Sequence, residues 1–214
     1  MNTSSRYLSI FIFSFFHSLT TFSQSEADWK QIIRGVEQKK IAKIKVGRQI
    51  KTFSDYYKID LNEDGFYEGM VVETSDSGSY IHLFKTDFTH FQKIFVDVGG
   101  AFSKVEKIEL KKLSNDGNIL LIYFNEGLVR YLGTQSRHLL YSVFIPKNIF
   151  EHELKISRGY VIFEEFSKNG HYHVRDYKVT VEDLDKDGIA EILIKANNIE
   201  RVMILSKDKV MKML

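Results

Sequence analysis

The chain has 214 residues, of which 43% are hydrophobic and 14% aromatic, and its 30 Lys and Arg nearly balance 28 Asp and Glu. This composition favours one globular domain with a sizeable core, and the near-neutral charge excludes a bulk electrostatic attraction to nucleic acid or to a membrane surface. The absence of cysteine excludes disulfides, thiolate zinc sites, cysteine nucleophiles and a lipid anchor on an N-terminal cysteine.

The first segment has the features of a secretory signal peptide. One positive charge, Arg6, precedes the apolar run 7–16 (YLSIFIFSFF), as in the first two regions of such signals. Polar residues then end the run well short of the roughly 20 apolar residues that a spanning helix needs. We expect cleavage after Ser23, which leaves residues 24–214 as one mature domain without a transmembrane segment. The predicted location is extracytoplasmic, either periplasmic or secreted.

The mature part reads as all-β after one short helix. Trp29, Ile32 and Ile33 recur at helical spacing just after the predicted cleavage site. Short β-branched and aromatic runs then alternate with Gly, Asn, Asp and Ser, which is typical of many strands. The expected strands are 50–59, 69–74, 80–85, 91–98, 104–112, 118–124, 128–132, 138–145, 158–167, 171–182, 190–196 and 199–206. Asn169-Gly170 predicts a type I′ hairpin turn that places Glu164 opposite Arg175.

Three segments around Asp-Gly resemble one another. Each has a strand, a polar loop with a leucine at a fixed place, Asp-Gly, and then an apolar strand. They are 57–73, 108–124 and 179–195. The irregular spacing predicts three degenerate repeats, at about 49–98, 99–150 and 151–214, in a small propeller-like or stacked antiparallel arrangement.

The last segment contains the pattern Asp-x-Asp-x-Asp-Gly-x-x-Glu. Four carboxylates within nine residues repel one another unless a cation compensates them, and calcium takes six to eight oxygen ligands. Gly188 permits the tight turn that the pattern needs. The predicted calcium ligands are the side chains of Asp183, Asp185, Asp187 and Glu191 and the carbonyl of Ile189.

The first segment repeats this pattern with one amide in place of a carboxylate, so we expect weaker affinity there. Its predicted ligands are the side chains of Asp60, Asn62, Asp64 and Glu68 and the carbonyl of Phe66. The middle segment has Lys112 and Leu120 at the first and ninth places, so we expect Lys112 to fill the space there instead of a metal. An EF-hand is rejected, because its glutamate belongs at the twelfth place, where this chain has Val71 and Ile194.

The pattern resembles the calcium loop of FG-GAP or VCBS-type repeats, which occur in integrin-like β-propellers and in many secreted bacterial proteins. The resemblance implies calcium on the alternating acids, on the seventh carbonyl and on the ninth acid, which are the residues named above in the last and first loops. The chain lacks the Phe-Gly and Gly-Ala-Pro elements that name the family. A second, looser resemblance joins residues 60–94 to periplasmic lysozyme-inhibitor-like β proteins.

Familiar catalytic motifs are absent: there is no Gly-x-Ser-x-Gly, no P-loop and no His-Glu-x-x-His. We therefore predict a non-catalytic secreted or periplasmic protein with one or two structural calcium ions, which binds a protein or a glycan and no nucleic acid. One alternative is a lysozyme-inhibitor-like protein. The other is an enzyme on a propeller-like scaffold, with His171, His173 and Glu164 as candidate groups. Oligomeric state stays open.

Overall fold

Three β-sheets make up the described part of the molecule. The computed structural model describes residues 43–44, 49–51, 56–75, 77–127 and 134–214. The predicted signal peptide, the predicted helix after it and the predicted strand at 128–132 lie outside these ranges. Within them, no helix has the length and hydropathy needed to cross a membrane. The prediction of an all-β fold with stacked, mostly antiparallel sheets is confirmed.

The first sheet has the strand order β1-β3-β4-β5-β6. Its strands are β1 (Lys43–Ile44), β3 (Tyr56–Ile59), β4 (Glu68–Ser75), β5 (Gly78–Phe84) and β6 (His90–Asp97). Neighbouring strands in this sheet are antiparallel, except for β1 and β3, which pair in parallel. This sheet carries the first Asp-Gly loop, between β3 and β4.

The middle sheet has the order β11-β10-β9-β8-β7-β2, and the C-terminal sheet has the order β12-β13-β14-β15. The middle strands are β2 (Gln49–Lys51), β7 (Lys104–Ser114), β8 (Gly117–Asn125), β9 (Thr134–Pro146), β10 (Tyr160–Lys168) and β11 (His171–Asp176). A short 3-10 turn, η1 (Ile149–Glu151), follows β9. The C-terminal strands are β12 (Lys178–Glu182), β13 (Glu191–Ala196), β14 (Ile199–Leu205) and β15 (Met211–Met213), the last of which the sequence did not predict.

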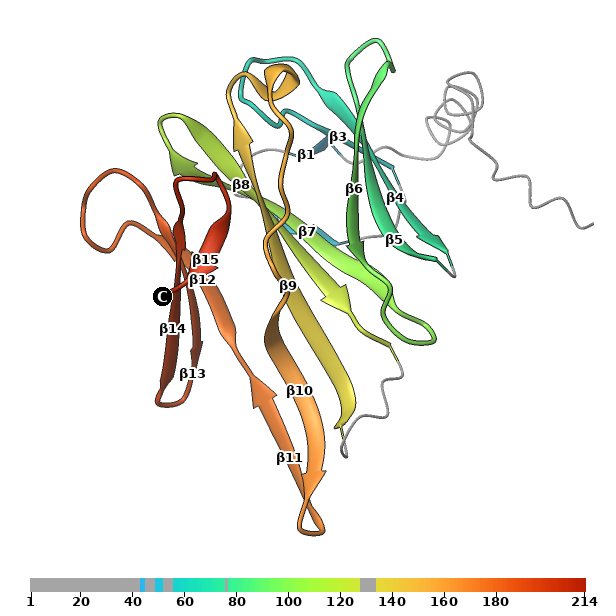
Figure 1. Ribbon diagram of the computed structural model, residues 1–214, viewed down its shortest axis with the longest axis vertical. Coiled ribbons are helices and arrows are strands. Elements are labelled where there is room, and N and C mark those ends of the chain that lie inside the picture. Colours follow the sequence, from blue (N-terminus) through green and yellow to red (C-terminus); the bar gives the residue numbers. More distant parts are fainter. Residues whose placement is uncertain (1–42, 45–48, 52–55, 76, 128–133) are drawn as a thin grey trace, which may run out of the picture.

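The centre of the middle sheet is buried on both faces, as strand β8 shows. Leu120, Ile122 and Phe124 belong to a core shared with the first sheet. Ile119 and Leu121 point the other way, into a core shared with the C-terminal sheet. Side chains alternate between the faces of a strand, so an unbroken apolar run is what a strand between two layers requires. The other two sheets thus lie on opposite sides of the middle one (Figure 1).

The strand predicted at 171–182 is two strands in two different sheets. β11 belongs to the middle sheet and β12 to the C-terminal sheet. Between them, Tyr177 is buried in the second core and donates its backbone N–H to the carbonyl of Ile162, 2.9 Å away. The prediction was wrong because the residues on both sides of Tyr177 have similar strand propensity, while the change of sheet depends on packing.

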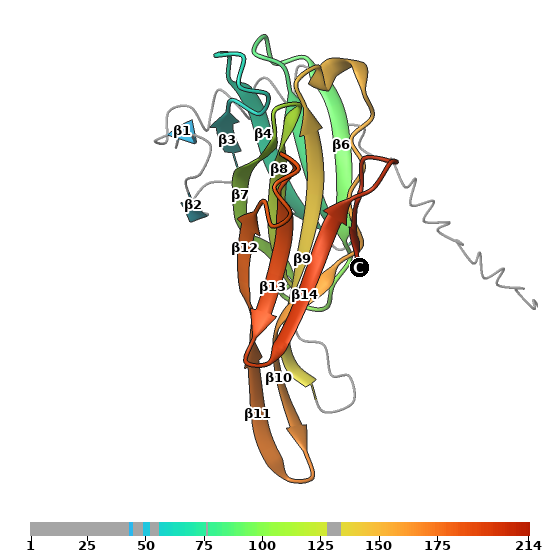
Figure 2. The ribbon, with the colours of Figure 1, turned by 90° about the vertical axis from the view of Figure 1, so that its left-hand side faces the viewer.

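The β10–β11 hairpin projects beyond the rest of the molecule (Figure 2). All six residues of β11 are exposed. The predicted turn is confirmed, with positive φ at Asn169 and Gly170, and so is the register that pairs Glu164 with Arg175. The Arg175 Nη1 atom lies 2.8 Å from the Glu164 Oε1 atom.

Candidate metal centre

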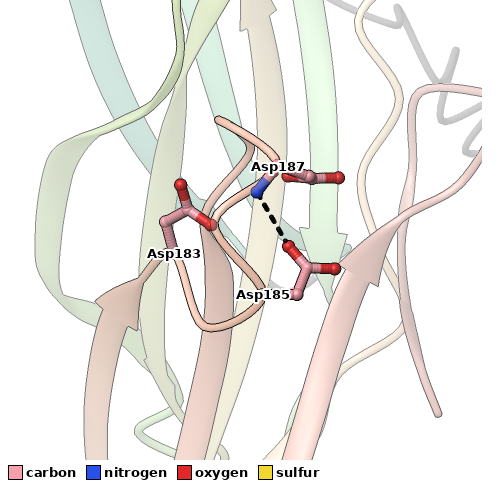
Figure 3. Close-up of side chains that lie close together, drawn as sticks. All are labelled: Asp183, Asp185 and Asp187. Carbon is pink, nitrogen blue, oxygen red and sulfur yellow. Dashed lines mark hydrogen bonds between the residues drawn. The ribbon is translucent and has the colours of Figure 1, made fainter.

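The last Asp-Gly loop links β12 to β13 and gathers three carboxylates. One oxygen each from Asp183, Asp185 and Asp187 lie within 4.8 Å of one another, and all three residues are exposed (Figure 3). Two oxygens that bind the same calcium ion at about 2.4 Å are at most about 4.8 Å apart. The spacing of these oxygens is therefore compatible with a shared calcium ion.

Backbone hydrogen bonds hold these carboxylates in place. The Gly188 N–H donates to Asp183 Oδ2 at 3.0 Å, the Asp187 N–H donates to Asp185 Oδ1 at 3.1 Å, and the Ile189 N–H donates to Asp187 Oδ1 at 2.7 Å. The second of these bonds is drawn in Figure 3. Each bond uses one oxygen of its carboxylate.

Glu191, the ninth residue of the pattern, has a different position. It begins β13, is only 8% exposed, and its Oε2 atom accepts the Leu184 N–H at 2.8 Å. It lies outside the group of three close aspartates. The structure thus brings together three of the predicted side-chain ligands, while Glu191 closes the base of the loop. A ligand role for Glu191 and for the Ile189 carbonyl stays a prediction.

The first Asp-Gly loop, between β3 and β4, repeats this backbone path. Its fourth residue has φ of 61°, against 65° in the last loop, and its glycine has φ of 88°, as in the last loop. The Gly65 N–H donates to Asp60, the Phe66 N–H to Asp64 and the Leu61 N–H to Glu68, at 3.2, 2.8 and 2.9 Å. Matched dihedrals and matched hydrogen bonds show that the two loops are one structural unit used twice.

The first loop differs because its carboxylates are already engaged. Asp60 accepts the N–H groups of Asp64 and Gly65, one on each oxygen. Asp64 accepts the Phe66 N–H on one oxygen and the Asn62 amide on the other, at 2.8 and 2.9 Å. Internal hydrogen bonds therefore already reach both oxygens of each of these two carboxylates.

Two predicted ligands of the first loop are buried with an unsatisfied oxygen. Asn62 is 7% exposed and Glu68 is 1% exposed, and neither Asn62 Oδ1 nor Glu68 Oε1 has a hydrogen-bond partner in the described structure. Burial raises the pKa of Glu68 to about 7, and the nearby Asp64 carboxylate adds to the increase. A buried acceptor without a hydrogen-bond donor needs a cation, a proton or a water molecule. These two unsatisfied oxygens therefore suit a calcium ion.

The middle Asp-Gly turn is a plain hairpin. Ser114 pairs with Gly117 across a two-residue turn, and the Asp116 N–H donates to Ser114 Oγ at 3.1 Å. The sequence had led us to expect that Lys112 fills the space in its own hairpin. That prediction was wrong, because a two-residue turn encloses no cage. The Lys112 ammonium lies 2.5 Å from a carboxylate oxygen of Glu63 in the first loop.

The middle hairpin connects the two acidic loops. The Asn118 amide donates to the Leu61 carbonyl at 2.9 Å on the first-loop side, and the Ala190 N–H donates to the Leu113 carbonyl at 2.7 Å on the other. The Asn62 amide also donates to the carbonyl of Lys147, just after β9, at 3.0 Å. All three Asp-Gly turns therefore meet at one end of the molecule. Their sequence similarity gave the only signal that they are related.

The candidate groups for an enzyme are not assembled into a site. His171 and His173 are exposed on β11, where the His173 ring stacks on Phe166 with centroids 5.1 Å apart. In the residues that the structure describes, no third histidine or acid completes a metal-binding group with them. Glu164 is paired with Arg175.

A histidine network around the buried His82 in the first sheet was missed by the sequence reasoning. His82 on β5 is 4% exposed, and its Nε2 atom lies 2.6 Å from Glu73 Oε2. Its Nδ1 atom lies 3.4 Å from His90 Nε2. Burial lowers the pKa of His82, although the hydrogen bond and charge of Glu73 oppose the shift. The three residues lie on neighbouring strands and share no recognisable motif, so the sequence gave no signal of this contact.

No protein-family model, curated protein or solved structure matches the chain.

Proposed function

We propose that this protein is a non-catalytic extracytoplasmic binding protein whose β domain is stabilised by calcium. The observation that supports this best is the group of three close carboxylates at Asp183, Asp185 and Asp187. The signal-like segment at residues 1–23 supports the location. The predicted ligand is a protein or a glycan.

Calcium fits the last loop better than zinc does. All the available side-chain ligands are carboxylate oxygens, which suit hard cations, whereas zinc in proteins is usually bound by nitrogen and sulfur. The loop is exposed and joins two strands, so the ion would hold the β12–β13 connection against the repulsion of its own carboxylates. Extracellular calcium modules bind with dissociation constants of about 10⁻⁴ to 10⁻³ M. Such affinity suffices where calcium is near millimolar.

A second ion is proposed for the first loop, on the evidence of its two unsatisfied buried oxygens, Asn62 Oδ1 and Glu68 Oε1. A cation there competes for Asp64 with the hydrogen bond from the Asn62 amide. That competition weakens the first site relative to the last. Isothermal titration of the calcium-free protein should give two classes of site, and a single class that persists in Asp185→Ala would contradict this order of affinities.

Thermal unfolding with excess EDTA and with millimolar calcium tests the main proposal. Millimolar calcium is about 1 to 10 times a dissociation constant of about 10⁻⁴ to 10⁻³ M and stabilises by about 0.4 to 1.4 kcal/mol, which for a domain of this size raises the melting temperature by roughly 1 to 6 °C. We expect this rise in the wild type and its loss in Asp185→Ala. Asp116→Ala is the control, because Asp116 is the Asp-Gly acid of the plain middle hairpin. No calcium-dependent shift in the wild type would sink the proposal.

A further inference from the structure

A pocket of about 560 Å³ lies between the end of β9, the segment after η1 and the β14–β15 turn, and no residue of the two acidic loops lines it. Its apolar part comes from Phe144 and Pro146 at the end of β9 and from Leu154 after η1. Its polar rim includes Lys147, Glu153 and Lys209. The volume is within the range of about 300 to 1,000 Å³ that is typical of small-molecule sites.

Hydrogen bonds from different elements fix the walls of this pocket. Gln92 on β6 binds both backbone groups of Leu154, with distances of 2.9 and 3.1 Å. The Lys147 N–H donates to the Asp116 carbonyl at 3.2 Å, and the Lys147 carbonyl accepts the Asn62 amide of the first loop at 3.0 Å. The opposite wall is the tight β14–β15 turn, in which Ser206 and Val210 are paired at 2.9 Å. The pocket is therefore largely formed before any ligand binds.

The charges around the pocket are balanced. The lining residues include three lysines and three acids, and one of the acids, Asp208, is paired with Lys212 outside the lining at 3.0 Å. The ammonium groups are those of Lys147, Lys155 and Lys209, and the carboxylates are those of Asp116, Glu153 and Asp208. A strongly anionic or cationic ligand would meet as much repulsion as attraction here. A neutral ligand rich in hydroxyl groups can instead donate to the carboxylates and accept from the ammonium groups.

The apolar wall selects further among neutral ligands. Phe144 and Leu154 are 5% and 6% exposed, so the wall is a small apolar floor beneath a polar rim. The Lys209 ammonium lies 5.2 Å from the centre of the Phe144 ring and so covers part of this floor with its flexible side chain. A pyranose ring has this combination of an apolar C–H face and hydroxyl groups at its edge.

We propose that this pocket is the ligand site of the protein and that it binds a neutral saccharide. The inference rests on the proposed function as a binding protein, and it narrows the ligand to a glycan. The hydrogen bond from Asn62 to Lys147 joins the pocket to the first loop. The wall at Lys147 therefore depends on a loop that the proposal also assigns to calcium.

The test has two steps, both with the protein expressed from the full chain and in millimolar calcium. The protein is first bound to an array of neutral and acidic glycans, and the saccharide that it retains most strongly is then titrated. We expect retention of neutral glycans and a loss of affinity of about tenfold or more in Glu153→Gln and in Lys209→Ala. Lys207→Ala is the matched control, because Lys207 lies in the same turn but does not line the pocket. It should bind as the wild type does.

Three outcomes would overturn the inference: no glycan retained, only acidic glycans retained, or neutral binding that neither pocket variant weakens. The calcium experiment is independent of this result. A calcium-dependent melting temperature without glycan binding would remove only the saccharide inference. Glycan binding in the pocket without any calcium effect would remove the structural role of calcium and leave the saccharide site in place.

Discussion

In the first loop, Asn62 occupies the position that Asp185 holds in the last loop. Its amide group donates to Asp64 and to the Lys147 carbonyl, at 2.9 and 3.0 Å, and it is buried. A carboxylate cannot donate either hydrogen bond. This single residue therefore keeps the first loop closed on itself and attached to β9, whereas the exposed aspartates of the last loop repel one another.

Replacing Asn62 by aspartate should make the first loop more dependent on calcium. Asn62→Asp puts a buried charge beside Asp64 and removes two hydrogen bonds, so we expect a loss of about 3 kcal/mol in EDTA. Calcium should recover most of it, because the loop then offers a carboxylate at all four side-chain positions. Thermal unfolding with and without calcium measures both effects. An equal loss in both conditions would show that the first loop binds no ion.

His82 should make stability depend on pH below neutrality. Burial lowers its folded pKa below the unfolded value of about 6.5, so the unfolded chain binds the proton first as pH falls. The contribution of His82 is thus complete above about pH 6.5 and is lost as pH falls toward the folded pKa. Glu68 has the opposite effect on stability. Its folded pKa is raised to about 7, so its contribution is present at low pH and is lost as pH rises toward 7.

The comparison of wild type with His82→Gln isolates this effect, because Glu68 is the same in both proteins. Chemical denaturation between pH 5 and 8 should show that the destabilisation by His82→Gln becomes smaller as pH falls. A constant difference between the two proteins over this range would contradict a buried, neutral His82.

Among the elements, the segment from β10 to β12 shows most clearly where sequence patterns stop being informative. The Asn169-Gly170 turn and the Glu164–Arg175 pairing were predicted correctly, because turn chemistry fixes a hairpin locally. The passage from β11 to β12 was not predicted. It depends on Tyr177 packing into a core with residues from β8, β9 and β13, and the local sequence carries no trace of those contacts.

Tyr177 should therefore matter far more for stability than its neighbour Tyr172. Tyr177→Ala removes a buried ring from the point where the chain changes sheets and should cost about 3 kcal/mol. Tyr172 is 56% exposed on the projecting hairpin, so Tyr172→Ala should leave the denaturation midpoint unchanged. Urea unfolding of both variants makes the comparison. Similar losses in the two would mean that the hairpin is part of the core.

For the whole molecule, the sequence supported the fold class and the loop pattern but not the layering. Alternating acids with glycine identified Asp183, Asp185 and Asp187 correctly as neighbours, because all three lie within one short loop. The run Ile119 to Phe124 reads as a buried strand, yet only the structure shows which sheet covers each face. The pocket was missed for the same reason, since its walls come from β9, from the segment after η1 and from the β14–β15 turn.

The shared middle sheet predicts that the three sheets unfold together. β8 contributes to both cores, so loss of either outer sheet exposes one face of its apolar run. Ile81 in the first sheet and Ile192 in the C-terminal sheet are both fully buried. Replacing either by alanine should cost about 2 to 5 kcal/mol and shift one common transition. Hydrogen exchange resolved by residue distinguishes the alternatives: if Ile192→Ala weakened protection in β13 and β14 but left β4 and β5 as stable as in the wild type, the sheets would be independent units.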